Sequence, residues 1–243
     1  IFHEKPFDGV NGSGKHCNWS IVTDTGVNLL SPGKTPTKNL QFLSFYASVL
    51  RAVHRHHYLL MASAATLSNS YRLGGNEAPP AVMSVFSGST LYRVFRSIMK
   101  MKELKEHSGK QETITIVNSI PEIFPDNTDR NRTSPFAFTG NKFEFRMLGS
   151  SNSIACANIM LNAAVAESLK IYADRLEGAE DFETKLHEMI KKTIKDHKRI
   201  LFNGNGYDDA WLEEAAKRGL CNYRTTPDCM PHLLDQKNVD MLT

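Results

Sequence analysis

One short stretch constrains the fold most, because its charged and apolar residues alternate. Residues 142–147 read KFEFRM, with Lys142, Glu144 and Arg146 as the charged members. Successive side chains of a β-strand point to opposite faces, so the pattern predicts a strand with one charged face and one buried face. A carboxylate between two cations suits a site for an anionic ligand and a metal ion. A merely solvated strand gives the same pattern.

The composition is that of a globular protein with one sizeable core. The chain has 243 residues, of which 41% are hydrophobic, enough for one large core and a smaller appendage. A net charge of +3 is too small to predict nucleic acid as a partner, and no run looks apolar enough to predict a membrane span. Four cysteines without a CxxC pair favour reduced thiols in a cytoplasmic protein. Because the chain starts with Ile1, we interpret it as an internal fragment.

A second strand is predicted after a glycine-containing loop. Residues 9–16 read GVNGSGKH and nearly match the phosphate-binding loop pattern, with His16 in place of its hydroxyl residue. A phosphate-binding loop requires a helix directly after it. Instead the chain alternates like a strand, with His16, Asn18 and Ser20 on one face. This face can supply a metal ligand and hydrogen bonds, and the glycines allow backbone amides to approach an anion closely.

Helical spacing of apolar residues accounts for much of the remaining chain. Predicted helices cover residues 40–53, 91–101, 154–178, 181–200 and 208–218, with a short last helix from Pro227. Short strands are predicted at 81–87 and 113–117. The tail of the first helix carries His54, His56 and His57, which we interpret as packing or surface residues rather than as a metal site. The last third of the chain shows no catalytic constellation, which predicts a structural role or an assembly surface.

Two loops have the composition of functional segments. Residues 69–80 read NSYRLGGNEAPP, in which two glycines and the carboxylate of Glu77 are typical of a mobile flap, although a plain turn fits as well. Residues 126–140 form a long polar loop that carries Arg130 and Arg132. Long loops in compact domains tend to be functional, and a guanidinium suits phosphate recognition.

Three motifs, taken in order, resemble the glutamine synthetase family. They are NGSGKH at 11–16, RLGGNEAPP at 72–80 and NRTSPFAFTGNKFEFR at 131–146. The long form NRTSPFAFTG, the RLGGNEAPP variant and the FNGNGY turn at 202–207 resemble the type III branch. The likeness runs along most of the chain.

The resemblance implies an α/β fold of the α+β kind. A catalytic domain is expected over residues 1–177, with a curved, mainly antiparallel sheet that lines the active site, and a helical C-terminal region is expected over residues 178–243. The family forms ring-shaped homo-oligomers, typically dodecamers in this branch. Further glutamate ligands for metal and a small β domain lie upstream in the family, so this piece alone is expected to be inactive.

The resemblance also assigns ligand-binding roles to individual residues. His16 and Glu144 match ligands of the metal ion, Mg²⁺ or Mn²⁺, that bridges the nucleotide phosphates. The two predicted strands put both residues on polar faces, as that role requires. Asn11 and Gly12 match positions that hold L-glutamate.

Four charged residues match positions around the reacting groups in the family's active site. Arg72 and Arg146 match arginines that bind glutamate or the reacting phosphoryl group. Arg132 matches an arginine that touches the transferred phosphate. Glu77 matches the flap carboxylate, which can bind ammonium and help to deprotonate it. Glu77, Arg132 and Arg72 are therefore the implied catalytic residues.

ATP is the implied co-substrate. Asn18, Ser20, Arg132 and Lys142 match positions that contact it. Asn18 departs from the histidine of other branches, and Lys142 replaces an arginine, which keeps the charge but loses the bidentate fork. A second phosphate arginine, expected a few residues after Arg132, is absent from the sequence, so another residue has to supply that group if it is needed.

The implied activity is ligation of ammonium to L-glutamate with ATP, through γ-glutamyl phosphate, to give L-glutamine, ADP and phosphate. A γ-glutamyl ligase that uses another amine stays open as an alternative. So does a non-catalytic assembly or binding module. Five retained residues argue against that module, because a drifting protein has no chemical reason to keep them: His16, Glu77, Arg132, Glu144 and Arg146.

Overall fold

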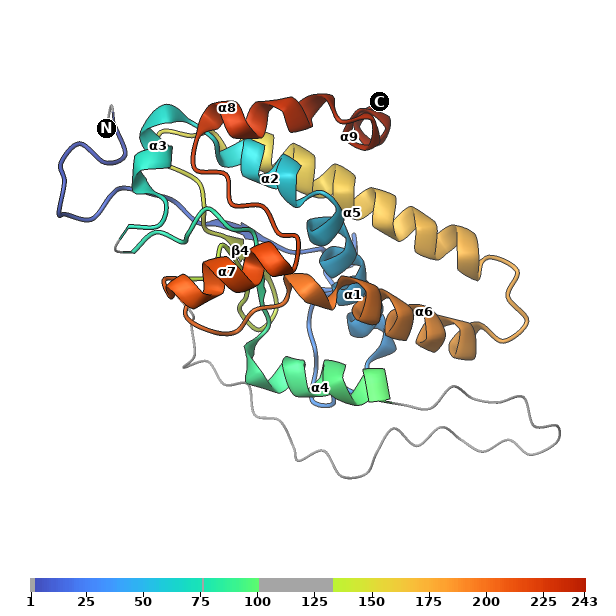
Figure 1. Cartoon of the computed structure of the whole chain (residues 1–243). Coiled ribbons are helices and arrows are strands. Elements are labelled where there is room, and N and C mark those ends of the chain that lie inside the picture. The colour runs from blue at the N-terminus through green and yellow to red at the C-terminus, as the bar shows by residue number, and fades with distance from the viewer. Residues whose placement is uncertain (1–2, 76, 101–132) are drawn as a thin grey trace.

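The computed structural model describes residues 3–75, 77–100 and 133–243, in which helices surround a small sheet (Figure 1). The strands are β1 (Cys17–Trp19), β2 (Val85–Phe86), β3 (Phe136–Phe138) and β4 (Phe143–Phe145). The helices are α1 (Leu40–Arg55), α2 (His57–Ala64), α3 (Leu67–Arg72), α4 (Gly88–Lys100), α5 (Ile154–Leu176), α6 (Phe182–His197), α7 (Asp209–Lys217), α8 (Thr226–Cys229) and α9 (Gln236–Leu242). Two 3₁₀ turns, η1 (Lys198–Ile200) and η2 (Met230–Leu234), complete the described elements.

β4 is the strand that the alternating stretch predicts. Its two phenylalanines are buried, whereas the side chain of Glu144 between them is 14% exposed. β4 pairs antiparallel with β1 and with β3, and β3 pairs parallel with β2, which gives the order β1-β4-β3-β2. A small mixed sheet surrounded by helices is consistent with the expected α/β fold. The curvature of the sheet stays a prediction.

β3 corrects the prediction of an uninterrupted polar loop over residues 126–140. Phe136, Ala137 and Phe138 form a buried strand between β4 and β2. The run is only three residues long and lies between residues that favour turns, so its local pattern is too short to predict a strand. Its place in the sheet comes from pairing on both edges. The predicted strand at 113–117 lies outside the described residues.

α1 forms the centre of the helical layer and confirms the predicted core helix. It packs against α5 on one side and α6 on the other (Figure 1). Its N-cap, Asn39, accepts a hydrogen bond from the backbone N–H of Phe42 at 3.0 Å, which satisfies a donor that the helix leaves free. Tyr46 connects the helix to the sheet: its ring lies 5.2 Å from those of Phe138 and Phe143, and its hydroxyl is 2.6 Å from that of Ser87.

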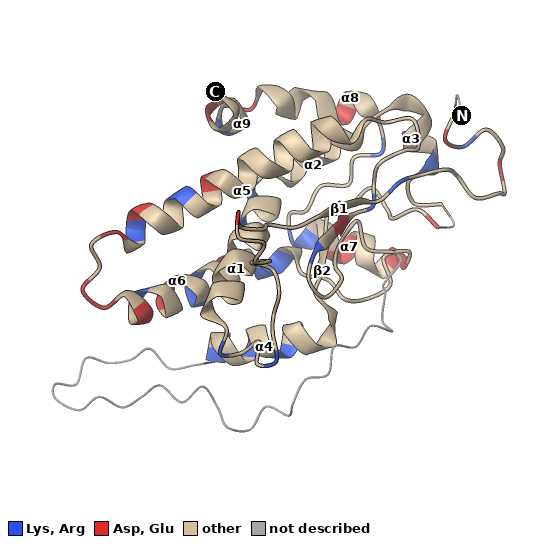
Figure 2. Ribbon diagram, turned by 180° about the vertical axis from the view of Figure 1, so that it is seen from behind, with Lys and Arg blue, Asp and Glu red and all other residues tan. Residues whose placement is uncertain are grey.

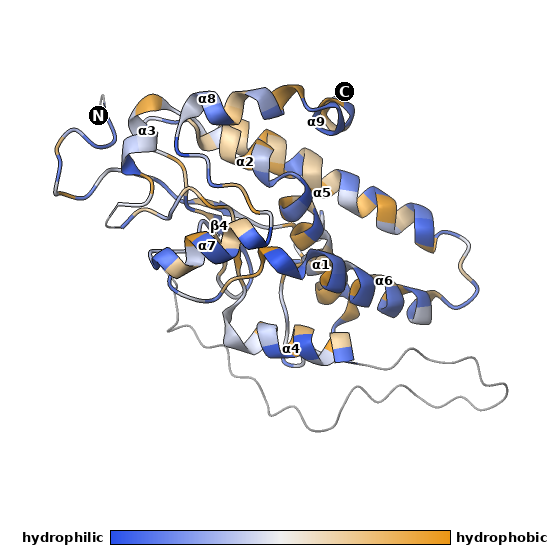
Figure 3. Ribbon diagram, viewed as in Figure 1, coloured by the Kyte–Doolittle hydropathy of each residue, from blue (hydrophilic) through white to orange (hydrophobic). Residues whose placement is uncertain are grey.

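The structure adds helices that the sequence interpretation missed, among them α2 and α3. α2 and α3 occupy the segment that we assigned to the tail of a helix and the start of a loop. α2 is buried on most sides and largely hydrophobic in Figure 3, so it lacks the amphipathic stripe that predicts a surface helix. α3 is too short for a periodic signal. Its last residue is Arg72, which therefore belongs to a helix end rather than to the flap.

α5 meets the length and composition test for crossing a membrane, alone among the helices that the structure describes. It has 23 residues with a hydropathy of 1.3, which differs from the expectation that no run is apolar enough. One face packs against α1, α2 and α9. A core helix of a globular domain passes the same test, so this finding is weak evidence for a membrane span.

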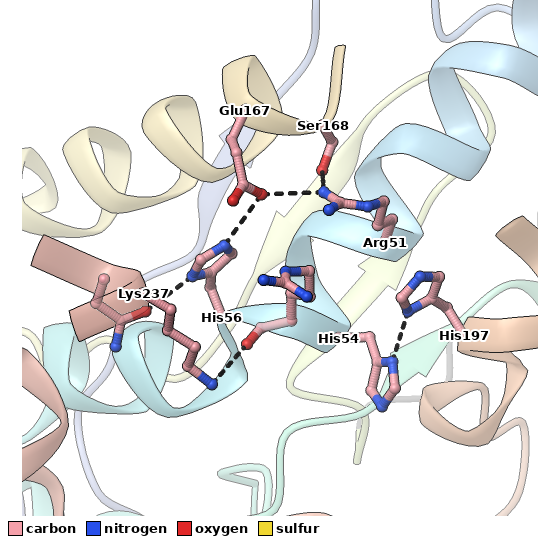
Figure 4. A network of polar contacts seen from close by, with 9 residues as sticks. Arg51, His54, His56, Glu167, Ser168, His197 and Lys237 are labelled. Carbon is pink, nitrogen blue, oxygen red and sulfur yellow. Dashed lines mark hydrogen bonds and ion pairs between the residues drawn. The ribbon is translucent and has the colours of Figure 1, made fainter. Parts of the chain in front are cut away.

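A polar network joins α1, α5 and α9 (Figure 4). Arg51 donates to Glu167 Oε2 at 2.9 Å and to Ser168 Oγ at 2.8 Å. The fully buried ring of His56 lies between Glu167 Oε2, at 3.3 Å, and Asn238 Oδ1, at 2.8 Å. His56 is thus a packing residue, as expected, and the network attaches the last helix to the core.

His54 and His197 form a separate contact in the same region, with their Nδ1 atoms 2.7 Å apart (Figure 4). Burial, followed by the charge of His197, lowers the pKa of His54 from 6.5 to about 3. Burial, followed by the charge of Arg51, lowers the pKa of His197 from 6.5 to about 4. The hydrogen bond requires a neutral partner, because two protonated rings offer donors only.

This pair predicts a loss of stability in mild acid. Its histidines take up protons more readily in the unfolded chain, so the free energy of unfolding falls as the pH drops below 6.5 toward 4. We expect the thermal midpoint of the full-length protein to be lower at about pH 5 than at about pH 7. This difference is expected to be smaller in His54→Gln. His3→Gln serves as the control. Equal falls in His54→Gln and the wild type would contradict this explanation.

Candidate active site

The pairing of β1 with β4 brings the two predicted metal ligands together. Asn18 lies opposite Glu144 in the ladder, and His16, two residues earlier, faces the same way. His16 Nδ1 is 3.7 Å from Glu144 Oε2, and the His16 side chain is 58% exposed. The structure thus places these two residues side by side, and their role as metal ligands stays a prediction.

Arg146 orients the carboxylate of this pair. Its Nε and Nη2 donate to Glu144 Oε2 at 3.2 and 3.1 Å, and Arg146 is 4% exposed. Burial, followed by the charge of Arg146, lowers the pKa of His16, which Glu144 raises in part. The imidazole is therefore neutral near pH 7, the form that binds metal ions.

The donor set fits part of a divalent cation site. One carboxylate oxygen and one ring nitrogen point to the same face, and both donor types occur in sites for Mg²⁺ or Mn²⁺. Within the described ranges no group of three or more His, Cys, Asp and Glu residues could hold a metal ion. The described residues thus offer two candidate donors for such a site, His16 and Glu144.

Residues 11–15, which include Gly12 and Gly14, are here called the glycine loop. This loop runs beside the residues that follow β4. Lys15 N donates to Leu148 O at 3.0 Å, and Ser150 N donates to Ser13 O at 3.1 Å. These bonds hold the loop against the end of the sheet. Asn11 and Gly12, the residues expected to hold glutamate, lie in this loop, five and four residues before His16.

Arg72 lies buried beneath this loop with 6% of its surface exposed. Its Nε donates to Asn69 Oδ1 at 2.9 Å, and its Nη2 donates to the carbonyls of Met147 and Leu148 at 3.0 Å each. In this structure the guanidinium therefore braces the main chain after β4. The roles expected for Arg72, glutamate binding and catalysis, stay predictions.

The glycines allow the loop to lie this close to Arg72. A Cβ atom on Gly12 would fall 2.4 Å from Arg72 Cγ, and one on Gly14 would fall 2.5 Å from Arg72 Nη1. Both distances are far below carbon contact distances. Glycine at these positions is thus a packing requirement.

Gly12→Ala is therefore expected to destabilise the protein by about 1–3 kcal/mol, the usual effect of overpacking. Thermal unfolding of the full-length protein measures the change. Gly75→Ala is the matched control, because a Cβ atom at Gly75 meets its nearest atom at 3.5 Å, an ordinary contact. Equal midpoints for the two variants would show that the loop moves aside freely.

Three of the other expected site residues, Asn18, Ser20 and Lys142, lie on β1 or close to the ends of β1 and β4. Asn18 is exposed on β1, and the Ser20 hydroxyl donates to Asn28 Oδ1 at 2.8 Å and to Asn141 O at 3.1 Å. Lys142, next to β4, is half-buried. Arg132 lies outside the described residues.

The described part of the flap that follows α3, residues 73–75 and 77–80, exposes Glu77. Gly74 N donates to Pro79 O at 2.9 Å, and Gly74 has a φ of 82°, a conformation that glycine adopts without strain. Burial, followed by the charge of Glu77, raises the pKa of Tyr207. The flap carboxylate thus lies near the FNGNGY turn, a proximity that the sequence interpretation missed.

A cavity of about 410 Å³ separates the outer side of the flap from the C-terminal region. Tyr71 and Gly74 line one side, and Tyr207, Asp209 and Arg224 line the other. The FNGNGY turn also approaches the chain near Arg132, since Gly206 N donates to Thr133 Oγ1 at 2.7 Å. The C-terminal region therefore contacts the loop at 126–140 through Thr133 and lies across the cavity from the flap.

A sheet face with a paired histidine and carboxylate, next to a glycine loop braced by arginine, fits the class of proteins that hold a divalent cation beside an anionic ligand. Comparison of the sequence with models of known families identifies the family within this class. The model of the glutamine synthetase catalytic domain matches residues 1–104, and the model of the glutamine synthetase C-terminal domain matches residues 185–243. The chain belongs to the glutamine synthetase family.

Curated relatives agree along the whole chain. It is 48% identical to a glutamine synthetase of Butyrivibrio fibrisolvens and 44% identical to the type-3 glutamine synthetase of Dictyostelium discoideum, with 100% of the chain covered in both. It is 47% identical to a glutamine synthetase of Bacteroides fragilis over 98% of the chain. The chain spans about a third of the length of these relatives. The expected family and branch are confirmed, and the boundary between residues 177 and 178 stays a prediction.

Proposed function

We propose that the full-length protein containing this chain is a glutamate–ammonia ligase that makes L-glutamine, ADP and phosphate from L-glutamate, ammonium and ATP. The observation that carries the proposal is an identity of 44–48% to proteins named glutamine synthetase over 98–100% of the chain. The adjacency of His16 and Glu144 supports it independently.

The proposed reaction has two steps. The side-chain carboxylate of glutamate attacks the γ-phosphorus of ATP, so that an O–P bond forms to give γ-glutamyl phosphate and ADP leaves. Ammonia then attacks the acyl carbon, a C–N bond forms, and the C–O bond to phosphate breaks. Ammonium loses one proton before this attack, and the nitrogen loses another as the amide forms.

The glycine loop and its neighbours bind the reactants in this proposal. Asn11 and Gly12 hold glutamate, and Arg146 attracts its charge or that of the reacting phosphoryl group. His16 and Glu144 hold a divalent cation, Mg²⁺ or Mn²⁺, whose charge neutralises the ATP phosphates. Two donors are too few for such a cation, so further ligands come from outside these residues and this chain alone is inactive.

ATP and ammonia are handled by the remaining candidates. Asn18, Ser20 and Lys142 contact ATP, and Arg132 stabilises the charge on the transferred phosphoryl group. Glu77 on the flap binds ammonium, accepts its proton and helps to exclude water from the acyl phosphate. Arg72 acts beside them by holding the loop that carries Asn11 and Gly12.

The proposed partners follow from the family. We infer self-association into a ring-shaped homo-oligomer, a dodecamer, and a cytoplasmic location, with a curved sheet that lines the active site. Nucleic acid and membrane are not among the proposed partners. Figure 2 shows Lys and Arg interspersed with Asp and Glu along α6, whereas α4 carries Lys and Arg alone.

Phosphate release by the full-length protein tests the proposal. With magnesium, ATP and glutamate, release is expected to depend on ammonium as well as on glutamate. Release with methylamine but not with ammonium would instead indicate a γ-glutamyl ligase for another amine. Absence of release while ATP still binds would indicate a non-catalytic module.

A further inference from the structure

Glu4 lies at the junction of three segments with its side chain fully buried. Its Oε1 accepts a hydrogen bond from the backbone N–H of Ser151 at 3.0 Å and another from the Ser151 hydroxyl. Its Oε2 accepts a hydrogen bond from the hydroxyl of Ser68 in α3. One carboxylate therefore joins α3 to the turn that follows β4.

The main chain of Glu4 holds the glycine loop directly. Its carbonyl accepts a hydrogen bond from Ser13 N at 2.7 Å. Gly149 packs against the same side chain, since a Cβ atom there would fall 2.6 Å from Glu4 Oε1. Glu4 thus fixes the loop, the turn and the helix relative to one another.

The carboxylate is ionised in this environment. Burial alone raises the pKa of Glu4, but the hydrogen bonds from Ser151 and Ser68 outweigh burial and lower it to about 2. Burial lowers the pKa of Arg72, and the charge of Glu4 raises it, so the two buried charges stabilise each other. A buried carboxylate without such partners is strongly unfavourable.

We propose that Glu4 is a positioning residue whose carboxylate sets the main-chain geometry of the glycine loop and thereby the affinity for L-glutamate. The inference rests on the proposed function for the identity of that ligand. Asn11 and Gly12 directly precede Ser13, whose N–H is bound to Glu4, so a shift of this contact displaces both.

The ATP contacts do not depend on Glu4 in the same way. Asn18 belongs to β1, which the ladder to β4 holds in place, and Ser20 is bound to Asn28 and Asn141. Loss of the Glu4 carboxylate is therefore expected to affect the binding of the two substrates differently. Binding of glutamate weakens while binding of ATP is retained.

Glu4→Gln tests this positioning role in the full-length protein. Glutamine keeps the size of the side chain, but its NH₂ group replaces one carboxylate oxygen. This group cannot accept a hydrogen bond from a hydroxyl or backbone amide donor. The KM for glutamate is expected to rise about tenfold, the effect of losing one hydrogen bond to a charged group, with the KM for ATP within about twofold. Asp8→Asn, which removes an exposed carboxylate just before the same loop, is the matched control. Equal KM values for glutamate in wild type and Glu4→Gln would overturn the proposal.

Amide hydrogen exchange gives a second test that needs no turnover. Exchange in a peptide that spans the glycine loop is expected to be faster in Glu4→Gln than in wild type and in Asp8→Asn. Unchanged exchange would overturn the positioning role, whereas a wild type without turnover would overturn the proposed function alone. If Glu4→Gln does not fold, Ser151→Ala, which removes one donor, replaces it with the same expected directions.

Discussion

Glutamine synthesis by the full-length protein is expected to fall about 1,000-fold in Glu144→Gln, as when a group that stabilises developing charge is removed from an active site. The amide cannot replace the carboxylate as a cation ligand, and it removes the charge that Arg146 contacts at 3.1 and 3.2 Å. Initial rates of ADP and glutamine formation measure the loss. Binding of Mn²⁺, followed by electron paramagnetic resonance, is expected to weaken in parallel.

Glu180→Gln is the matched control for this result, because it makes the same chemical change at an exposed position between α5 and α6. Its rates and Mn²⁺ binding are expected to equal those of the wild type. Full activity in a folded Glu144→Gln variant would show that Glu144 on β4 takes no part in the mechanism. Normal Mn²⁺ binding with lost activity would assign Glu144 a role other than metal binding.

The second large effect is expected on stability, from Arg72→Met. Methionine fills a similar volume but donates no hydrogen bonds, so Asn69 and the buried carbonyls of Met147 and Leu148 lose donors at 2.9 to 3.0 Å. Glu4 loses a cation that stabilises it. We expect a loss of about 3–5 kcal/mol, typical of removing one member of a buried charged network.

Thermal unfolding of the full-length protein measures this loss. Arg93→Met, at an exposed position of α4, is the matched control and is expected to stay within about 0.5 kcal/mol of the wild type. If Arg72 acted only as a ligand of glutamate, Arg72→Met would raise the KM for glutamate with the thermal midpoint unchanged. That outcome would contradict the bracing role seen beneath the glycine loop.

Long periodic patterns made much of the fold predictable. α1, α5, α6 and α7 lie within a few residues of their expected positions, because each buries a regular apolar stripe. The alternation in 142–147 predicted β4 and the face of Glu144. A similar alternation after residue 16 predicted β1, and the pairing of these two strands brings His16 beside Glu144.

Elements without a period of their own were not predictable in this way. α2 is buried on most sides, and β3 has three residues that gain their structure from pairing on both edges. Glu4 lies among polar residues and before a proline, where a sequence favours an exposed turn. Its burial depends on Ser68 and Ser151, which are 64 and 147 residues away, so no local pattern reports it.

The route through γ-glutamyl phosphate is tested by following the oxygen atoms of the glutamate side chain. The full-length protein is incubated with ATP, ammonium and L-glutamate that carries ¹⁸O in both side-chain carboxylate oxygens. Because the attacking oxygen of glutamate stays with phosphorus when the acyl phosphate is opened, we expect one ¹⁸O atom in the released phosphate and one in glutamine. Unlabelled phosphate, or phosphate released without glutamine, would contradict this route.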